Sequence, residues 1–333
     1  MGRIVVISTG GTIASRWKGS GFAAEADGRE VMATAPLPEG VSVEVVDLFS
    51  VNSPRLTTAH QLTLLRTVHE VLADPDVDGI VVTHGTDTLE ESAFLVDLHH
   101  HDVRSVVFTG SQLPMGSAEG DGPGNLYDAL LTAATTRGLG VLVTFAGRVH
   151  AARGTVKTQA VALDAFADPS KELLGKVGFG KVTVLREPQR PAPLALPAMP
   201  ELPPRVDMVM HHADGDPVLL NAAVEAGARG IVLVGTGAGN ATPEIVDAVS
   251  AAIARGVLVA LTTRVAAGPV TEIYTHGGAV DLVAAGAVPT GTLRAGQARI
   301  AVLSALLASA EPAEQARVLR ELLGSAGSVL VDA

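Results

Sequence analysis

Short apolar runs recur along the 333-residue chain, and each ends in a segment rich in glycine or polar residues before a helical pattern begins. Such runs are typical of buried strands. Their alternation with helices predicts an α/β fold with a mostly parallel sheet flanked by helices, in which the loops after the strands gather at one edge. The runs in the first half of the chain are Arg3–Ser8, Gly79–Thr83, Ser105–Thr109 and Gly140–Phe145.

The composition changes between residues 188 and 205, where proline recurs. Because proline interrupts helices and central strands, this stretch is predicted to be an extended linker. We therefore expect a larger N-terminal domain over residues 1–187 and a smaller C-terminal α/β domain over residues 206–333. The strands predicted in the smaller domain are Val206–Met210, Gly230–Val234 and Gly256–Thr262.

Composition and charge narrow the class of protein. Apolar residues make up 47% of the chain but aromatic residues only 3%, so Ala, Val, Leu and Ile must form the core. The net charge of −11 disfavours nucleic acid or an anionic membrane surface as a partner, because both would be repelled. The absence of cysteine excludes disulfides, thiolate metal sites and cysteine nucleophiles. The strand pattern begins near residue 3 without a secretion signal, so we expect a cytoplasmic protein.

Two threonine-containing segments follow predicted strands. Residues 9–15 read Thr-Gly-Gly-Thr-Ile-Ala-Ser. The glycines allow a tight turn and leave N–H groups open, so the Thr12 hydroxyl can attack a carbonyl beside an oxyanion site. Residues 84–91 read His-Gly-Thr-Asp-Thr-Leu-Glu-Glu and add a hydroxyl and a carboxylate at a helix entrance. For each segment the alternative is structural, as a glycine turn or a helix cap.

A weak nucleophile such as threonine needs a neighbouring base or cation, and Lys157 is a candidate for that role. The alternative is a solvated surface lysine. A polar, weakly patterned stretch over about residues 14–34 follows Thr12, and we predict that it is a flexible lid, with an ordinary surface loop as the alternative.

Three other patterns do not indicate a cofactor or metal site. The glycines at 235, 237 and 239 depart from the spacing of a dinucleotide-binding turn. The run 99–101 consists of histidines, but consecutive side chains cannot all face one ion, so we interpret it as a solvated helix end. His211 and His212 are interpreted as structural. We expect neither a metal nor a cofactor.

At this point the sequence resembles a known family. Residues 9–14 and 84–91 closely resemble the two signature segments of bacterial L-asparaginases, and they occur in the family's order. The segment 121–127, Asp-Gly-Pro-Gly-Asn-Leu-Tyr, and the segment 151–153 ahead of Lys157 resemble two further characteristic stretches. The resemblance covers nearly the whole chain, the smaller domain included.

The resemblance implies roles for particular residues. Thr12 matches the nucleophile that forms an acyl-enzyme, and the second catalytic cluster matches Thr86, Asp87 and Lys157, with Asp87 also holding the substrate's α-amino group. The substrate-binding residues that it implies are Gly11 at the oxyanion site, Ser53 at the α-carboxylate, Pro54 in place of a polar neighbour, and Ser111.

The family's site lies between two subunits, so the resemblance also implies a homo-oligomer, expected to be a tetramer built as a dimer of intimate dimers. Asn240 and Glu272 match the Asn and the acid that the neighbouring subunit supplies. Many members carry a lid tyrosine beside the nucleophile. This chain has only Tyr127 and Tyr274, so Thr12 must be activated by water, by another lid residue or by Tyr274.

The expected activity is hydrolysis of the side-chain amide of L-asparagine to L-aspartate and ammonia. Two alternatives stay open. One is an amidohydrolase for glutamine or another amino-acid amide, which Pro54 and the lid composition motivate. The other is a non-catalytic, asparagine-binding regulatory protein, which the missing lid tyrosine motivates.

Overall fold

The computed structural model describes residues 2–323, and these divide into two compact units on either side of the bond between Pro193 and Leu194. Within the described chain, residues 185–205 form neither helix nor strand. None of the helices among the described residues is long and apolar enough to cross a membrane.

The first unit is built on one eight-stranded sheet with the order β12-β11-β8-β7-β6-β5-β1-β4. The five strands from β4 to β7 are parallel, and β8, β11 and β12 extend the sheet in antiparallel pairing. In sheet order the strands span β12 Lys181–Val184, β11 Gly175–Gly178, β8 Arg148–Ala151, β7 Val141–Phe145, β6 Val106–Thr109, β5 Gly79–Thr83, β1 Gly2–Ser8 and β4 Val41–Asp47.

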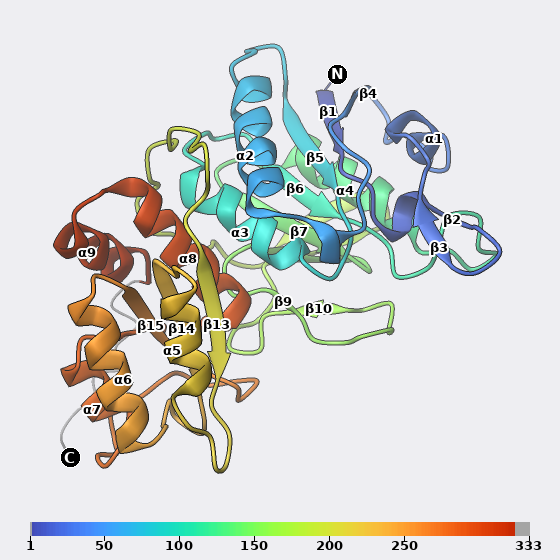
Figure 1. Ribbon diagram of the computed structural model, residues 1–333. Helices are drawn as coiled ribbons and strands as arrows, with labels where there is room; N and C mark the ends of the chain where they lie inside the picture. The colour runs from blue at the N-terminus through green and yellow to red at the C-terminus, as the bar shows by residue number, and fades with distance from the viewer. Residues whose placement is uncertain (1, 324–333) are drawn as a thin grey trace. The chain divides into compact units, whose positions relative to one another are not determined.

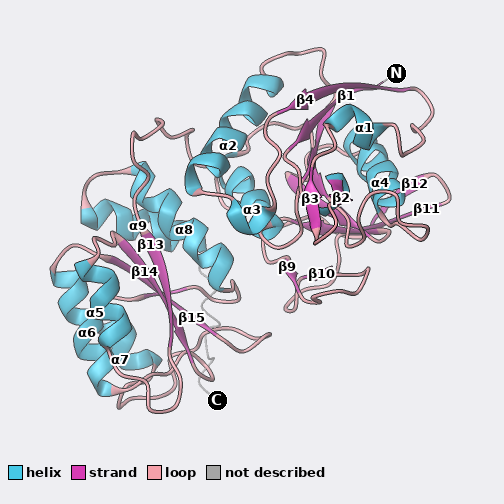
Figure 2. Ribbon diagram, turned by 45° about the vertical axis from the view of Figure 1, so that its right-hand side comes forward, coloured by secondary structure: helices cyan, strands magenta, loops and turns pink. Residues whose placement is uncertain are grey.

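Helices cover both faces of this sheet, as Figure 2 shows. On one side lie α2 (Thr58–Leu72) and α3 (Leu89–His99), and on the other lie α1 (Gly28–Met32) and α4 (Gly122–Thr135). The central strands are apolar throughout because neither face meets water: Ile4 to Ile7 in β1 are at most 2% exposed. The predicted α/β fold with a mostly parallel sheet is confirmed.

The second unit contains a parallel sheet with the order β13-β14-β15-β16. Its core packs Leu220, Ile231 and Val249 between the sheet and the helices α5 to α7 (Figure 1). The strands are β13 Val206–Met210, β14 Gly230–Gly235, β15 Leu258–Thr263 and β16 Val288–Pro289. The helices are α5 Val218–Glu225, α6 Pro243–Ala254, α7 Ala279–Ala284, α8 Ala295–Ala308 and α9 Pro312–Leu323.

The histidine run at the end of α3 corrects one sequence interpretation. His99 and His100 are buried, whereas a solvated helix end was expected. The helix end is covered because Arg190 donates hydrogen bonds to the carbonyl oxygens of Asp97 and His100, at 2.9 and 2.7 Å. The His100 Nε2–H donates to the carbonyl of Arg104, at 2.9 Å. Burial lowers the pKa of His100 to about 4, so the ring is neutral at pH 7.

The segment predicted to be an irregular lid has regular structure. It forms an antiparallel hairpin of β2 (Ser15–Trp17) and β3 (Phe22–Ala24), followed by α1. The Trp17 and Phe22 rings meet edge to face with centroids 5.1 Å apart. Its mobility stays a prediction.

Candidate active site

The loops that follow the parallel strands of the first unit are joined at the carboxyl edge of the sheet. The Thr9 N–H donates to the carbonyl of Thr83 at 3.1 Å, and the Thr9 carbonyl accepts from the N–H of Val51 at 3.1 Å. The His84 N–H donates to the carbonyl of Thr109 at 2.9 Å. Segments distant in sequence therefore meet at one place, as expected for an open α/β sheet.

Two glycines and a small serine allow these loops to approach one another closely. Gly11 has a φ of +87°, and a Cβ placed there would lie 2.4 Å from the Cα of Gly85. A Cβ on Gly85 would in turn lie 2.7 Å from the Cβ and Oγ of Ser53. Only glycine fits at the first two positions, and Thr12 and Thr86 each directly follow one of these glycines.

Thr86, Asp87 and Lys157, which the resemblance assigns to one catalytic cluster, are joined by hydrogen bonds, and their catalytic role stays a prediction. Lys157 lies in β9 (Val156–Lys157), and its Nζ donates to Thr86 Oγ1 at 2.8 Å and to Asp87 Oδ1 at 2.7 Å. The Lys157 side chain is 15% exposed and that of Asp87 is 54% exposed. The cation is thus held away from bulk water while the carboxylate keeps an open side.

Gln112 completes the surroundings of Thr86 and was not predicted from the sequence. The Thr86 hydroxyl donates to Gln112 Oε1 at 3.1 Å. The Gln112 amide donates in turn to the carbonyls of Ala160 and Ala162, at 3.2 and 3.1 Å. The available signal was its place in the polar loop after β6, directly beside Ser111.

Glu90 lies behind Lys157 and was also missed, because its place in the first turn of α3 is explained by the helix dipole. Its carboxylate accepts a hydrogen bond from the backbone N–H of Lys157 at 2.5 Å. Burial raises the pKa of Glu90 to about 7, and the charge of Glu91 adds to the increase, while Lys157 opposes it.

The buried His84 side chain holds the Gly85 turn in place through hydrogen bonds. Because a carbonyl can only accept, Nδ1 carries the proton that bonds to Gly85 O at 2.7 Å, and Nε2 then accepts from Ser92 Oγ at 3.0 Å. Burial lowers the pKa of His84 to about 4, so it is a neutral structural group.

Thr12 differs from Thr86 in its surroundings. It begins a short 3-10 helix over Thr12–Ala14, with Gly11 in the N-cap position. Among residues 2–323 its hydroxyl has no hydrogen-bond partner, and the backbone N–H groups of Gly11 and Thr86 donate to no protein acceptor. The Thr12 hydroxyl and these two N–H groups are therefore available to a substrate, and they lie on loops that are in contact at Gly11 and Gly85.

The other predicted binding residues of the first unit lie on these same loops. Ser53 is buried, its Oγ accepts from the N–H of Asp87 at 3.2 Å, and its carbonyl accepts from the Thr88 hydroxyl at 3.0 Å. Pro54, beside it in the 3-10 helix Ser53–Arg55, is exposed. The Ser111 hydroxyl donates to the carbonyl of Leu113 at 2.7 Å, which leaves it free only as an acceptor.

The remaining predicted residues, Asn240 and Glu272, belong to the second unit. The loops that carry them are joined, because the N–H of Thr271 donates to the carbonyl of Ala238 at 3.0 Å. Asn240 Oδ1 is buried without a hydrogen-bond partner within the described chain, and Glu272 is exposed. Tyr274, also in this unit, is 56% exposed.

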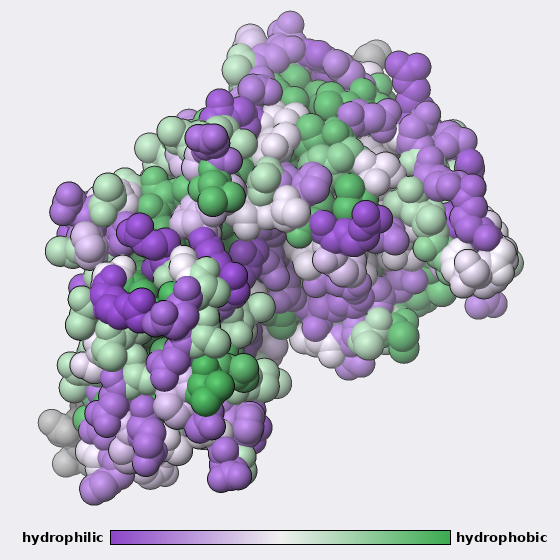
Figure 3. Space-filling view, in the orientation of Figure 1, coloured by the Kyte–Doolittle hydropathy of each residue, from purple (hydrophilic) through white to green (hydrophobic). Residues whose placement is uncertain are grey.

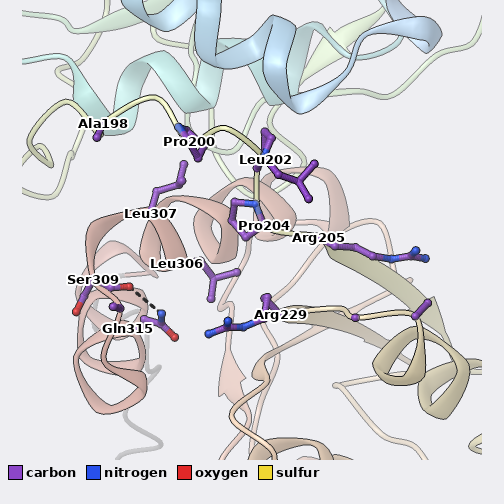
Figure 4. Close-up of a pocket in the computed structure, with 14 residues that line it drawn as sticks. Ala198, Pro200, Leu202, Pro204, Arg205, Arg229, Leu306, Leu307, Ser309 and Gln315 are labelled. Carbon is purple, nitrogen blue, oxygen red and sulfur yellow. Dashed lines mark hydrogen bonds between the residues drawn. The ribbon is translucent and has the colours of Figure 1, made fainter.

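A cavity of about 940 Å³ in the second unit contains none of these residues. Figure 4 shows Pro200, Leu202 and Pro204 facing the end of α8. The Gln315 amide donates to the Ser309 carbonyl at 2.8 Å. The cavity's size therefore does not locate the chemistry. The convergence of hydroxyl, carboxylate, ammonium and amide groups does.

The fold and the site define a two-domain α/β protein with paired threonines, an acid and a lysine at the edge of the sheet. Comparisons with known proteins identify the family. Residues 3–190 match the family model "Asparaginase, N-terminal", and residues 205–319 match "Glutaminase/Asparaginase C-terminal domain". The chain belongs to the asparaginase family.

Individual relatives agree over nearly the full length. An L-asparaginase of Bacillus licheniformis is 36% identical over 320 residues, covering 92% of this chain and 96% of the relative. A "Probable L-asparaginase periplasmic" of Haemophilus influenzae is 31% identical, covering 93% and 90%. The crystal structure of a "Probable Cytoplasmic L-asparaginase" from Campylobacter jejuni superposes with a TM-score of 0.87 at 28% identity, covering 96% and 99%.

Proposed function

We propose that this protein is an L-asparaginase that hydrolyses the side-chain amide of L-asparagine to L-aspartate and ammonia. The observation that carries the proposal is the contact of Lys157 Nζ with both Thr86 Oγ1 and Asp87 Oδ1, on a loop packed against the Thr12 loop. A family relationship over nearly the whole chain supports the same reaction.

In the first half of the proposed reaction, Thr12 Oγ attacks the amide carbon of the substrate. The negative charge that forms on the carbonyl oxygen is stabilised by the unoccupied N–H groups of Gly11 and Thr86. The C–N bond then breaks, the hydroxyl proton of Thr12 passes to the departing nitrogen, and ammonia leaves. The product of this step is an ester between Thr12 and the aspartyl group.

In the second half, water attacks the ester carbon and the Thr12–acyl bond breaks. A proton of the water passes through the Thr86 hydroxyl to Thr12 Oγ, which regenerates the threonine. The Lys157 ammonium supports this relay because it donates directly to Thr86 Oγ1. Asp87, half-exposed, accepts from the α-ammonium of the substrate. Ser53 Oγ accepts from Asp87, so its own proton is available to the α-carboxylate.

We propose that the site is completed by a second subunit, in a homotetramer arranged as a dimer of intimate dimers. Asn240 and Glu272 of the neighbour would contact the substrate, and water or Tyr274 of the neighbour would activate Thr12. An exposed apolar face on the second unit supports association. It comprises Met208, Met210, Val218 and Leu219, each at least 50% exposed, and Figure 3 shows hydrophobic side chains gathered over α5 and β13.

We further propose a cytoplasmic enzyme of asparagine catabolism. Support comes from the Campylobacter jejuni relative, which is named cytoplasmic, although the Haemophilus influenzae relative is named periplasmic. Cell fractionation of the native host with an antibody to this chain tests the location.

The deciding experiment is ammonia release by the purified protein with L-asparagine, L-glutamine and D-asparagine, beside the variant Thr12→Ala. Rapid release from L-asparagine that is lost in the variant is expected. No release from L-asparagine contradicts the proposed activity. Faster release from L-glutamine favours an amidohydrolase for another amide, the alternative that Pro54 motivates.

A non-catalytic, asparagine-binding protein is the second candidate, because the Thr12 hydroxyl has no activating partner within residues 2–323. Calorimetry separates the two candidates. Binding of L-asparagine without ammonia release supports the regulatory protein, whereas turnover excludes it.

A further inference from the structure

The turn between β11 and β12 places Phe179, a bulky aromatic residue, in a backbone conformation with positive φ. Gly178 pairs with Lys181 in the strand register, so the loop consists of Phe179 and Gly180 alone. Their φ angles are +52° and +68°, the signature of a type I′ turn. Both central positions of that turn favour Gly, Asn or Asp, and a bulky aromatic residue with positive φ is an outlier that costs roughly 1–2 kcal/mol.

Phe179 gains no compensating burial within the subunit. Its side chain is fully exposed, the most exposed large apolar side chain among the described residues. Backbone strain and ring exposure are two separate costs, and asparagine would remove both. A strained, exposed aromatic residue is a reason to look for a partner outside the fold.

A hollow of about 530 Å³ lies directly beside this turn. It is bordered by the turn itself through Gly180, by the strand β12 and by the C-terminal end of α4, which Figure 2 shows next to one another at the edge of the first unit. Its lining includes Leu131, Thr135, Leu139, Val182 and Val184. Because β12 is the last strand of the sheet, a partner can approach from that side.

We propose that this surface is an interface between two copies of the chain, in which Phe179 of each subunit inserts into the hollow of the other. In a two-fold interface the same patch meets itself, so a projection must lie beside the depression that its copy fills. Phe179 and the hollow satisfy this condition, because Gly180 follows Phe179 in the turn and also lines the hollow.

The charges at the rim fit the same arrangement. Arg137, Lys181 and Glu187 border the hollow. Arg137 makes a 3.5 Å ion pair with Asp78, and Lys181 and Glu187 form no ion pair within the described residues. Both signs are therefore present on one patch, and a two-fold axis brings Lys181 of one subunit towards Glu187 of the other. This surface is distinct from the apolar face of α5 and β13 and from the candidate active site.

The test is sedimentation velocity of the full chain over a concentration series. Phe179→Asn removes the ring and suits the type I′ turn, so its melting temperature should match or exceed that of the wild type. Because both inserted rings are lost and each anchor contributes about tenfold, association at this interface should weaken by about a hundredfold. Thr135→Trp, which fills the hollow, should weaken association to a similar degree.

Val103→Asn is the matched control, since Val103 is 67% exposed on the first unit and does not border the hollow. Association that weakens in Phe179→Asn and Thr135→Trp but not in the control establishes the interface. Unchanged association in Phe179→Asn, an equal loss in Val103→Asn, or a wild type that stays monomeric at micromolar concentration overturns it. None of these outcomes depends on asparaginase activity.

Discussion

Thr12 and Thr86 follow neighbouring strands, each directly after a glycine, and their loops touch, yet the two hydroxyls have different surroundings. Thr86 accepts from Lys157 and donates to Gln112, so its proton and one of its two lone pairs are used. Thr12 has no partner among the described residues. One loop is assembled within the subunit, and the other is open to a substrate.

This difference bears on how the site would work. A group that transfers protons benefits from fixed partners, because its orientation is then set before the reaction. A nucleophile that has to form a covalent bond needs an unobstructed approach. We infer that the Thr86 loop is the preorganised half of the site and that the Thr12 loop is completed by the substrate, by water or by a second subunit.

The largest effect is expected from removing the cation of the preorganised half. Lys157→Met retains much of the side chain's length but leaves Thr86 and Asp87 without their donor. We expect kcat for L-asparagine to fall by about a thousandfold, in the range typical of lost proton-transfer groups. Steady-state ammonia release measures it, with the exposed Lys171→Met as control. A fall of less than about tenfold would mean that the cluster is structural.

Glu90, which anchors the backbone of Lys157, should make stability depend on pH. Its folded pKa of about 7 lies above the ordinary value of 4.5, so the folded state binds the proton more tightly. The Glu90 contribution to the free energy of unfolding is therefore fully present below pH 4.5 and falls as the pH rises towards 7, by at most about 3 kcal/mol.

The measurement is the difference in urea denaturation between the wild type and Glu90→Gln from pH 5 to pH 8. A difference is needed because buried His84, His100 and His150, with pKa values lowered to about 4, give the opposite trend between pH 4 and 6.5. The control is Glu39→Gln, because Glu39 is exposed and its charge does not contribute to the raised pKa of Glu90. A wild type and a Glu90→Gln variant with parallel pH profiles would contradict the assignment.

A smaller effect is expected on the free energy of unfolding when each of the two threonine hydroxyls is removed in turn. Thr86→Val removes the groups that pair with Lys157 and Gln112 and should lower the free energy of unfolding by about 1–3 kcal/mol. Thr12→Val breaks no hydrogen bond of the described chain and should change it by less than about 0.5 kcal/mol. Chemical denaturation measures both, and equal losses would show that Thr12 has a partner in solution.

The sequence predicted the assembled half in part. The bounds of β5 and β13 match those predicted, because a buried strand followed by polar residues is a local signal. The grouping of Lys157 with Thr86 and Asp87, which lie 71 and 70 residues away, rested on the family resemblance, and the catalytic role of the three residues stays a prediction. The antiparallel strands β11 and β12 were not predicted from the sequence. Their turn carries Phe-Gly where a type I′ hairpin normally has Asn-Gly or Gly-Gly.

Other parts depend on contacts that no local pattern reveals. The burial of His100 is decided by Arg190, which lies 90 residues away in the chain. The role of Gln112 depends on the carbonyls of Ala160 and Ala162, which lie 48 and 50 residues away. In both cases a polar side chain that would be solvated in isolation is fixed by a segment that only the tertiary fold brings to it.

Gln112 gives the smallest expected effect and the sharpest test of preorganisation. Gln112→Met keeps the volume but removes the acceptor of the Thr86 proton and the donors to Ala160 and Ala162. Thr86 keeps its bond to Lys157, so its hydroxyl loses orientation but not its relay partner, and kcat should fall about tenfold while KM stays within about twofold. The control is Gln159→Met, because Gln159 is exposed on the 158–165 loop that carries Ala160 and Ala162. If kcat is unchanged, Lys157 alone suffices to orient Thr86. If KM rises instead, Gln112 acts by holding the 158–165 loop against the substrate, and the assembled half of the site is then a binding surface rather than a proton relay.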